Sequence, residues 1–161
     1  MLLQEEEWKK LNTQEKIDLL QTVAYIEVNR LELPNVLNVG VFVLQEGTQG
    51  RYLDETHMIY IDLEHIERDM ASEVISTLLH EVYHSWQWRL VDAYKGKNIQ
   101  DSKLYNKAAT YVKEFTDYEN GTEEIITYYI QQCEIDARKY ARSAVTDYYL
   151  EVKKYIKNQE M

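Results

Sequence analysis

The chain of 161 residues has few of the residues that interrupt or cross-link a fold, with one cysteine, one proline and five glycines. Because Cys133 stands alone, no intrachain disulfide can form, which fits a reducing compartment. So few helix-breaking residues predict long helices and one small β region. No apolar run reaches transmembrane length, and the N-terminus lacks the basic and apolar segments of a secretory signal. We therefore expect a soluble cytoplasmic protein with no membrane partner.

Positive charge is also scarce. The formal net charge is −10 and the sequence pI is about 4.9, and the Lys and Arg residues are scattered among acids. Such a chain repels phosphate backbones, so we expect no nucleic-acid partner. Hydrophobic residues make up 45% of the chain, which is enough to build a core. The length suits one domain spanning residues 1–161.

The order of the expected elements predicts an α+β fold. A helix should begin at Asn12 or Thr13, with Glu15 placed for a capping box, and should end at Pro34. Hydrophobic alternation and periodicity then predict strands over Val36–Leu44, Arg51–Asp54 and His57–Leu63, followed by helices over Asp69–Tyr94, Asp101–Asp117 and Thr122–Lys157. A small mixed or antiparallel sheet should therefore precede a helix-rich C-terminal half.

One short motif carries chemistry: His80-Glu81-Val82-Tyr83-His84 within the predicted helix Asp69–Tyr94. A helix turns about 100° per residue, so His80 and His84 stand one turn apart on one face and can converge on one ion. Gln87 lies near that face, whereas Ile75, Leu78, Leu79, Val82 and Trp86 form an apolar back. Neutral imidazoles bind zinc and leave its charge uncancelled, and Glu81 is placed to act as the general base for water.

A catalytic zinc ion needs a third protein ligand. No histidine follows His84, so this ligand is an acid unless His57 or His65 folds back. The best candidate is Glu134, at the border of an apolar stripe on the last predicted helix. Small residues at Ala137 and Ala141 on that helix would allow a close approach to the metal helix, and Asp136 and Arg138 could supply supporting hydrogen bonds.

With these residues, the chain resembles the gluzincin branch of the zincin metallopeptidases, and most of all its minimal single-domain forms. The resemblance covers the architecture from about Val36 to Ala144 and rests on the H-E-x-x-H segment and the segment around Glu134. It implies zinc (Zn²⁺) bound by His80, His84 and Glu134, with Glu81 as the general base. In many gluzincins the ligand glutamate is followed by an acid three or four positions later, whereas here Asp136 is only two positions later.

The resemblance has two further implications. A Tyr or His should stabilise the oxyanion, and Tyr128, Tyr129, Tyr140 and His57 all remain open for this role. The strand before the metal helix, His57–Leu63, should be an edge strand that pairs with an extended peptide.

The sequence thus predicts a zinc-dependent peptidase that acts on a peptide or protein. One alternative is a catalytically inactive or latent zincin-like module that binds metal for regulation. Another is a helical interaction protein without metal. A latent form would require the first 30 residues, or the segment after about Tyr148, to lie across the cleft. Cys133 is expected in the core, and His57 and His65 are expected to be structural or on the surface.

Overall fold

The computed structural model describes residues 4–119 and 131–159, and these form a mainly helical α+β structure with one small sheet, as the sequence predicts. The described helices are α1 (Glu5–Trp8), α2 (Thr13–Arg30), α3 (Leu63–Arg68), α4 (Ala71–Lys95), α5 (Ser102–Glu119) and α7 (Gln132–Gln159). The strands are β1 (Asn38–Phe42), β2 (Gly50–Leu53) and β3 (Met58–Asp62).

The predicted start of α2 is confirmed. The Asn12 side chain accepts a hydrogen bond of 3.0 Å from the backbone N of Glu15, and the Glu15 carboxylate accepts one of 2.8 Å from the backbone N of Asn12. Helix α3 was not predicted. It forms because the Asp62 side chain accepts a hydrogen bond from the backbone N of His65 and so caps the first turn of the helix. Strand β3 ends at this capping residue. The part of the predicted last helix before residue 131 lies outside the described residues.

The sheet has the strand order β1-β3-β2. Strand β1 pairs parallel with β3, and β2 pairs antiparallel with β3. The expectation that His57–Leu63 is an edge strand is therefore wrong, because β3 has a partner on each side. A strand that pairs on both sides has no free backbone groups for a peptide. Strand β2 is an edge strand, because it lies at one end of the strand order.

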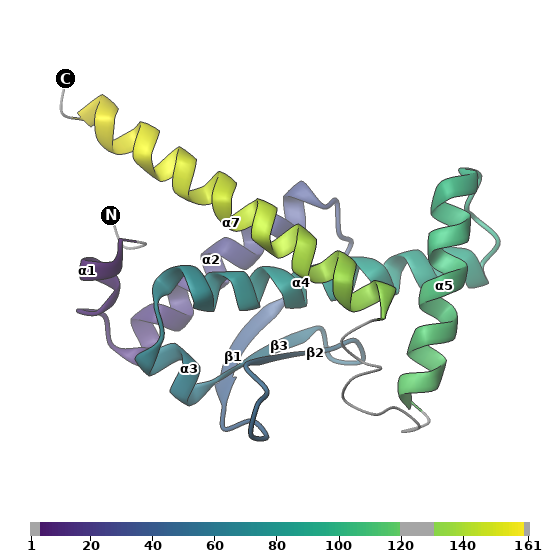
Figure 1. Ribbon diagram of the computed structural model, residues 1–161, viewed down its shortest axis with the longest axis horizontal. Coiled ribbons are helices and arrows are strands. Elements are labelled where there is room, and N and C mark those ends of the chain that lie inside the picture. Colours follow the sequence, from purple (N-terminus) through teal and green to yellow (C-terminus); the bar gives the residue numbers. More distant parts are fainter. Residues whose placement is uncertain (1–3, 120–130, 160–161) are drawn as a thin grey trace.

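Helix α4 runs through the middle of the molecule, with the sheet along one side and α7 crossing it (Figure 1). The main hydrophobic core lies between α4, α2, the sheet and α7. Its largest fully buried side chains include those of Trp8, Leu20, Ile59, Ile61, Ile75, Leu78 and Leu79. Ala141 and Ala144 of α7 belong to this core, and their small side chains let α7 lie close to α4.

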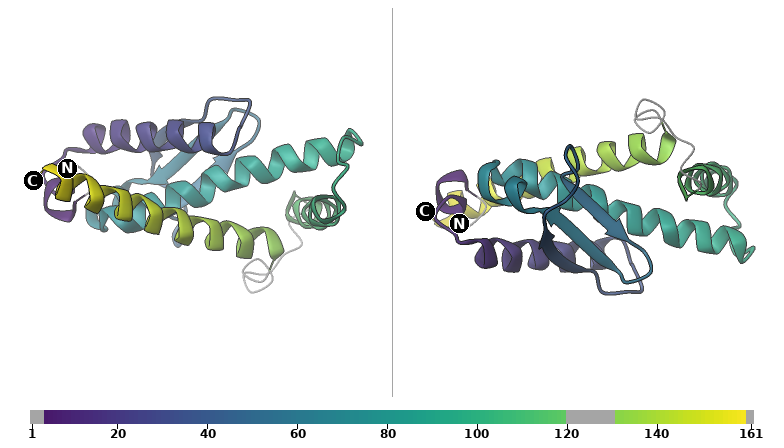
Figure 2. Two further views of the ribbon diagram at one scale, coloured as in Figure 1. Left: turned by 90° about the horizontal axis from the view of Figure 1, so that it is seen from above. Right: turned by 90° about the horizontal axis from the view of Figure 1, so that it is seen from below.

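A second, smaller core joins the C-terminal half of α4 to α5 and to the start of α7. It contains Leu90, Val91, Ala108, Tyr111 and Cys133. Helix α5 therefore lies at one end of the molecule, while α1 and the C-terminal end of α7 lie at the other (Figures 1 and 2). Among the described residues, no helix combines the length and hydropathy needed to cross a membrane.

Candidate metal centre

The two histidines of the H-E-x-x-H motif project from one face of α4, and the opposite face of that helix is buried. Of the predicted apolar back, Ile75, Leu78, Leu79 and Val82 have no exposed surface, whereas Trp86 is partly buried and packs against the second core. His80 and His84 are partly exposed, with side-chain exposures of 16% and 13%. Core packing of one face thus turns both imidazoles toward the surface of the helix that can receive a ligand.

Glu134 comes from the first turn of α7. The start of α7 is held by Glu114 of α5, whose carboxylate oxygens accept hydrogen bonds of 2.6 Å from the backbone N of Gln132 and 2.8 Å from that of Cys133. These are helix-terminal N–H groups that have no partner within the helix. Ala137, one turn after Cys133, is fully buried, so α7 packs closely enough to bring Glu134 to α4.

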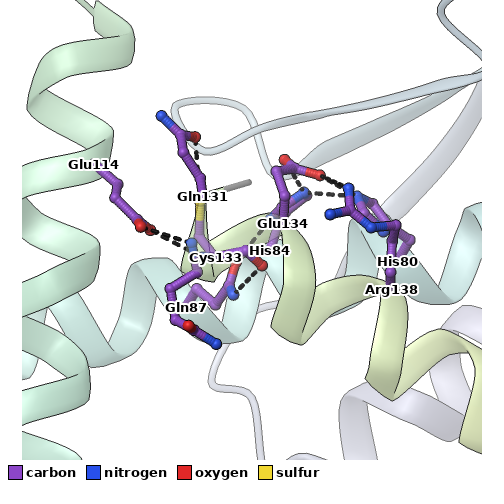
Figure 3. A network of polar contacts seen from close by, with 9 residues as sticks. His80, His84, Gln87, Glu114, Gln131, Cys133, Glu134 and Arg138 are labelled. Atoms are coloured by element: carbon purple, nitrogen blue, oxygen red, sulfur yellow. Dashed lines mark hydrogen bonds and ion pairs between the residues drawn. The ribbon is translucent and has the colours of Figure 1, made fainter. Parts of the chain in front are cut away.

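The three side chains meet at one point (Figure 3). Glu134 Oε2 lies 3.1 Å from His80 Nε2, and Glu134 Oε1 lies 3.1 Å from His84 Nε2. The two Nε2 atoms are 2.9 Å apart. Burial opposes the charged forms, but the hydrogen bonds and the opposite charges prevail. They raise the pKa of His84 from 6.5 to about 9 and hold that of Glu134 well below its ordinary value.

This donor set fits a divalent transition metal. Two imidazole nitrogens and one carboxylate oxygen, all within 4.8 Å of one another, match the three-ligand pattern of catalytic zinc sites. Ligand atoms about 2.1 Å from a tetrahedral ion lie roughly 3.4 Å apart. The observed separations of 2.9–3.1 Å need to widen by only a few tenths of an ångström to accept the ion.

Glu81 lies beside this cluster, between α4 and the start of β2. An added Cβ at Gly50 would lie 2.6 Å from Cγ2 of Thr77, 3.1 Å from Cγ of Glu81 and 3.2 Å from its Oε1. Only glycine leaves room for β2 to pass α4 this closely. Glu81 is 7% exposed and lines the same cleft as the two histidines.

The cleft has a volume of about 1410 Å³. It is lined by the β2 region, by the face of α4 that carries His80 and His84, and by the start of α7. Trp88 and Phe115 also line it. In the described part of the chain, neither the first 30 residues nor the segment after Tyr148 contributes to this lining. The described segments at the two ends therefore do not block the cleft as the latent form would require.

The other histidines do not join the cluster. His65 is buried, with Nδ1 2.6 Å from Oδ2 of Asp69, the C-cap of α3, and Nε2 2.8 Å from Oγ1 of Thr77 on α4, so both ring nitrogens have partners and the second contact links α3 to α4. His57 lies in the turn before β3, where its Nδ1 is 3.5 Å from the Tyr52 hydroxyl. His65 is thus structural, as expected.

The residues that support the cluster differ in part from those expected. Asp136 does not contact either histidine. Its carboxylate accepts hydrogen bonds from the Tyr111 hydroxyl and from Gln132, and lies 3.3 Å from Lys107 Nζ. Its spacing from Glu134 turns it toward α5 rather than toward α4, so this expectation is wrong. Arg138 does contact Glu134, with 3.7 Å between Nη1 and Oε2.

Gln87 takes the role expected of Asp136. Its Oε1 lies 2.7 Å from His84 Nδ1, and its Nε2 donates a hydrogen bond of 2.8 Å to the carbonyl of Cys133. The sequence places Gln87 near the histidine face of the helix, but only the packing of α7 shows that the amide is enclosed. The spacing from His84 to Gln87, three residues, was the available signal.

Of the side chains considered for oxyanion stabilisation, Tyr128 and Tyr129 lie outside the described residues. The Tyr140 hydroxyl donates to Glu27, and neither Tyr140 nor His57 lines the cleft. Cys133 is buried, as expected, and burial raises the pKa of its thiol, which keeps it protonated.

Comparisons with family models, with curated proteins and with solved structures find no match to this chain.

Proposed function

We propose that this protein is a zinc-dependent peptidase with a zincin-like, gluzincin-like site. The observation that carries the proposal is that ligand atoms of His80, His84 and Glu134 lie within 4.8 Å of one another and that all three residues line one cleft. Glu81 lines the same cleft on the next position of the helix. His80, His84 and Glu134 would hold a divalent ion, which would supply a Lewis acid that makes a water in the cleft more acidic.

Glu81 is the proposed general base. Its carboxylate is enclosed between α4 and Gly50 yet still reaches the cleft. In this position it accepts a proton from the attacking water and delivers it to the leaving amine. The scissile carbonyl is placed beside the ligands by the rest of the peptide.

An extended peptide fits along β2. The backbone N of Asp62 donates to the carbonyl of Gln49, so these two residues form a hydrogen-bonded pair of the antiparallel ladder. Alternation along the ladder then directs the backbone groups of Gly50 and Tyr52 away from β3. Both residues line the cleft, so a substrate strand can pair with this edge and lie over the metal ligands. A peptide or protein in the cytoplasm is the proposed substrate.

Metal content and cleavage together test the proposal. Elemental analysis should find about one zinc per chain in the wild type and a marked loss in Glu134→Ala. Glu81→Gln should keep its zinc but cleave a peptide library on the order of 10²–10⁴ times more slowly.

Three outcomes separate the alternatives. Zinc without cleavage would favour a metal-binding module. A wild type without zinc, even after zinc is supplied, would reject the metal site and favour an interaction protein. Zinc retained in full by Glu134→Ala would mean that the third ligand is another residue.

A further inference from the structure

Gln87 is a buried polar side chain of α4 that also contacts α7, the helix that carries Glu134. It lies on α4 three residues after His84 and has no exposed surface. A buried primary amide is costly unless both its oxygen and its nitrogen find partners. Here each does: the oxygen lies 2.7 Å from His84 Nδ1, and the nitrogen donates over 2.8 Å to the carbonyl of Cys133 (Figure 3).

The direction of these contacts follows from one atom that can only accept. The Cys133 carbonyl cannot donate, so the NH₂ group of Gln87 must face it. The amide oxygen then faces His84 and can only accept, so Nδ1 of His84 carries the hydrogen. In the neutral ring this leaves the lone pair on Nε2, the atom that points at Glu134 and His80.

The Gln87 amide also helps to position Glu134, the third side chain of the cluster. Cys133 directly precedes Glu134, so a hydrogen bond to its carbonyl holds the first turn of α7 against α4 next to the ligand glutamate. Glu114 holds the same turn from α5 through the backbone N of Cys133. The peptide groups on both sides of Cys133 are therefore anchored.

We infer that Gln87 is the positioning residue of the metal centre: it sets the tautomer of His84 and the placement of Glu134 at once. This inference rests on the proposed metal site and concerns the residue that orients two of its ligands. Partners that orient ligand histidines usually contribute 10–100-fold to metal affinity, so the loss of both hydrogen bonds should weaken binding by about that factor.

The first test compares zinc affinities, measured by competition with a chromophoric chelator. Gln87→Leu keeps most of the side-chain volume and removes both hydrogen bonds, and we expect zinc binding to weaken by about 10–100-fold. Gln132→Leu is the matched control, because its exposed amide on α7 contacts Asp136 and not the cluster. The control should bind zinc as the wild type does.

The second test observes the tautomer directly. In zinc-loaded protein with ¹⁵N-labelled histidine, the Nδ1–H proton of His84 should give a downfield resonance protected from exchange with water. In Gln87→Leu this resonance should move upfield because Nδ1–H loses its acceptor, a shift that a general loss of stability would not produce. In Gln87→Glu it should persist, because a carboxylate still accepts from Nδ1, while zinc affinity changes because the donor to Cys133 is lost.

The results distinguish the role of Gln87 from the proposed zinc site on which it depends. A wild type that binds no zinc overturns both. Zinc bound equally by the wild type and Gln87→Leu, with an unchanged His84 resonance, overturns the role of Gln87 and leaves the metal site standing. If Gln87→Leu does not fold, as judged by circular dichroism, Gln87→Glu decides, and an unchanged zinc affinity in that variant overturns the inference.

Discussion

The Tyr148 hydroxyl donates a hydrogen bond of 3.0 Å to Oε1 of Glu27, which ties the second half of α7 to α2. The Tyr140 hydroxyl donates to the other carboxylate oxygen, and Arg30 Nη1 lies 3.1 Å from Oε1. Glu27 has no exposed surface, so these three partners satisfy a charge that could not otherwise be buried. These contacts hold α7 to α2, and no described residue after Tyr148 lines the cleft.

Removing this carboxylate should destabilise the protein strongly. Glu27→Ala leaves two tyrosine hydroxyls without their acceptor and Arg30 without its partner. We expect a loss of about 3–5 kcal/mol in the free energy of unfolding, measured by urea denaturation. Asp147→Ala, at an exposed position on α7, should stay within about 0.5 kcal/mol of the wild type. Equal stability of the two variants would show that the buried cluster is not stabilising.

Gly50→Ala should displace β2 from α4. Its Cβ would lie 2.6 Å from Cγ2 of Thr77 and 3.1 Å from Cγ of Glu81, so the strand or one of these two side chains must move. We expect a loss of about 1–3 kcal/mol in stability and a larger fall in peptide cleavage than in zinc content. Those three quantities can be measured on the same preparation.

The double variant Gly50→Ala with Thr77→Ser provides the control. Serine lacks the Cγ2 methyl group but keeps the hydroxyl that contacts His65. It should therefore restore most of the lost stability. If it restores none, the close approach at Thr77 is not the cause of the defect.

Glu114→Gln should weaken the start of α7. The variant keeps an oxygen acceptor but loses the negative charge that faces the first backbone N–H groups of the helix. We expect a cost of about 0.5–2 kcal/mol and a modest fall in zinc affinity, since Glu134 lies in that first turn. Hydrogen exchange of the amides of Gln132 and Cys133 should quicken, and unchanged exchange would contradict a capping role.

Low pH should weaken metal binding, whereas high pH should lower the stability of the metal-free protein. The folded-state pKa of His84 is raised to about 9, so its contribution to stability is complete below 6.5 and is lost as the pH rises through 9. The pKa of Glu134 is lowered, so its contribution is present above 4.5 and is lost as the pH falls. Without metal, the pair therefore stabilises the fold most between pH 4.5 and 6.5.

Zinc bound at His84 would displace the proton of that ring, so its apparent affinity should fall about tenfold for each pH unit below 9. Urea midpoints in the presence of a chelator, together with zinc titrations between pH 6 and 9, measure both tendencies. His84→Gln should abolish the alkaline loss of stability. An affinity for zinc that does not change with pH would contradict the proposed role of His84 as a ligand.

Several features could be predicted from local sequence alone. The period of the apolar residues places His80 and His84 on one face of α4 and buries the other, because helix geometry is set by residues within a turn or two. The capping box of Asn12 and Glu15 is equally local. The border position of Glu134 beside a stripe containing Ala137 and Ala141 correctly indicated an inward carboxylate for the same reason.

Other features were decided only by tertiary structure. Strand order depends on which distant segments pair, so the alternation in His57–Leu63 could not show that β3 is central and that β2 forms the edge along the cleft. The supporting contacts depend on how α7 is rotated and shifted against α4 and α5. That packing turns Asp136 toward Tyr111 and encloses Gln87 between His84 and the Cys133 carbonyl. Periodicity determines the face on which a side chain lies, whereas its partner is set by the position of another element, which is a property of the packed core.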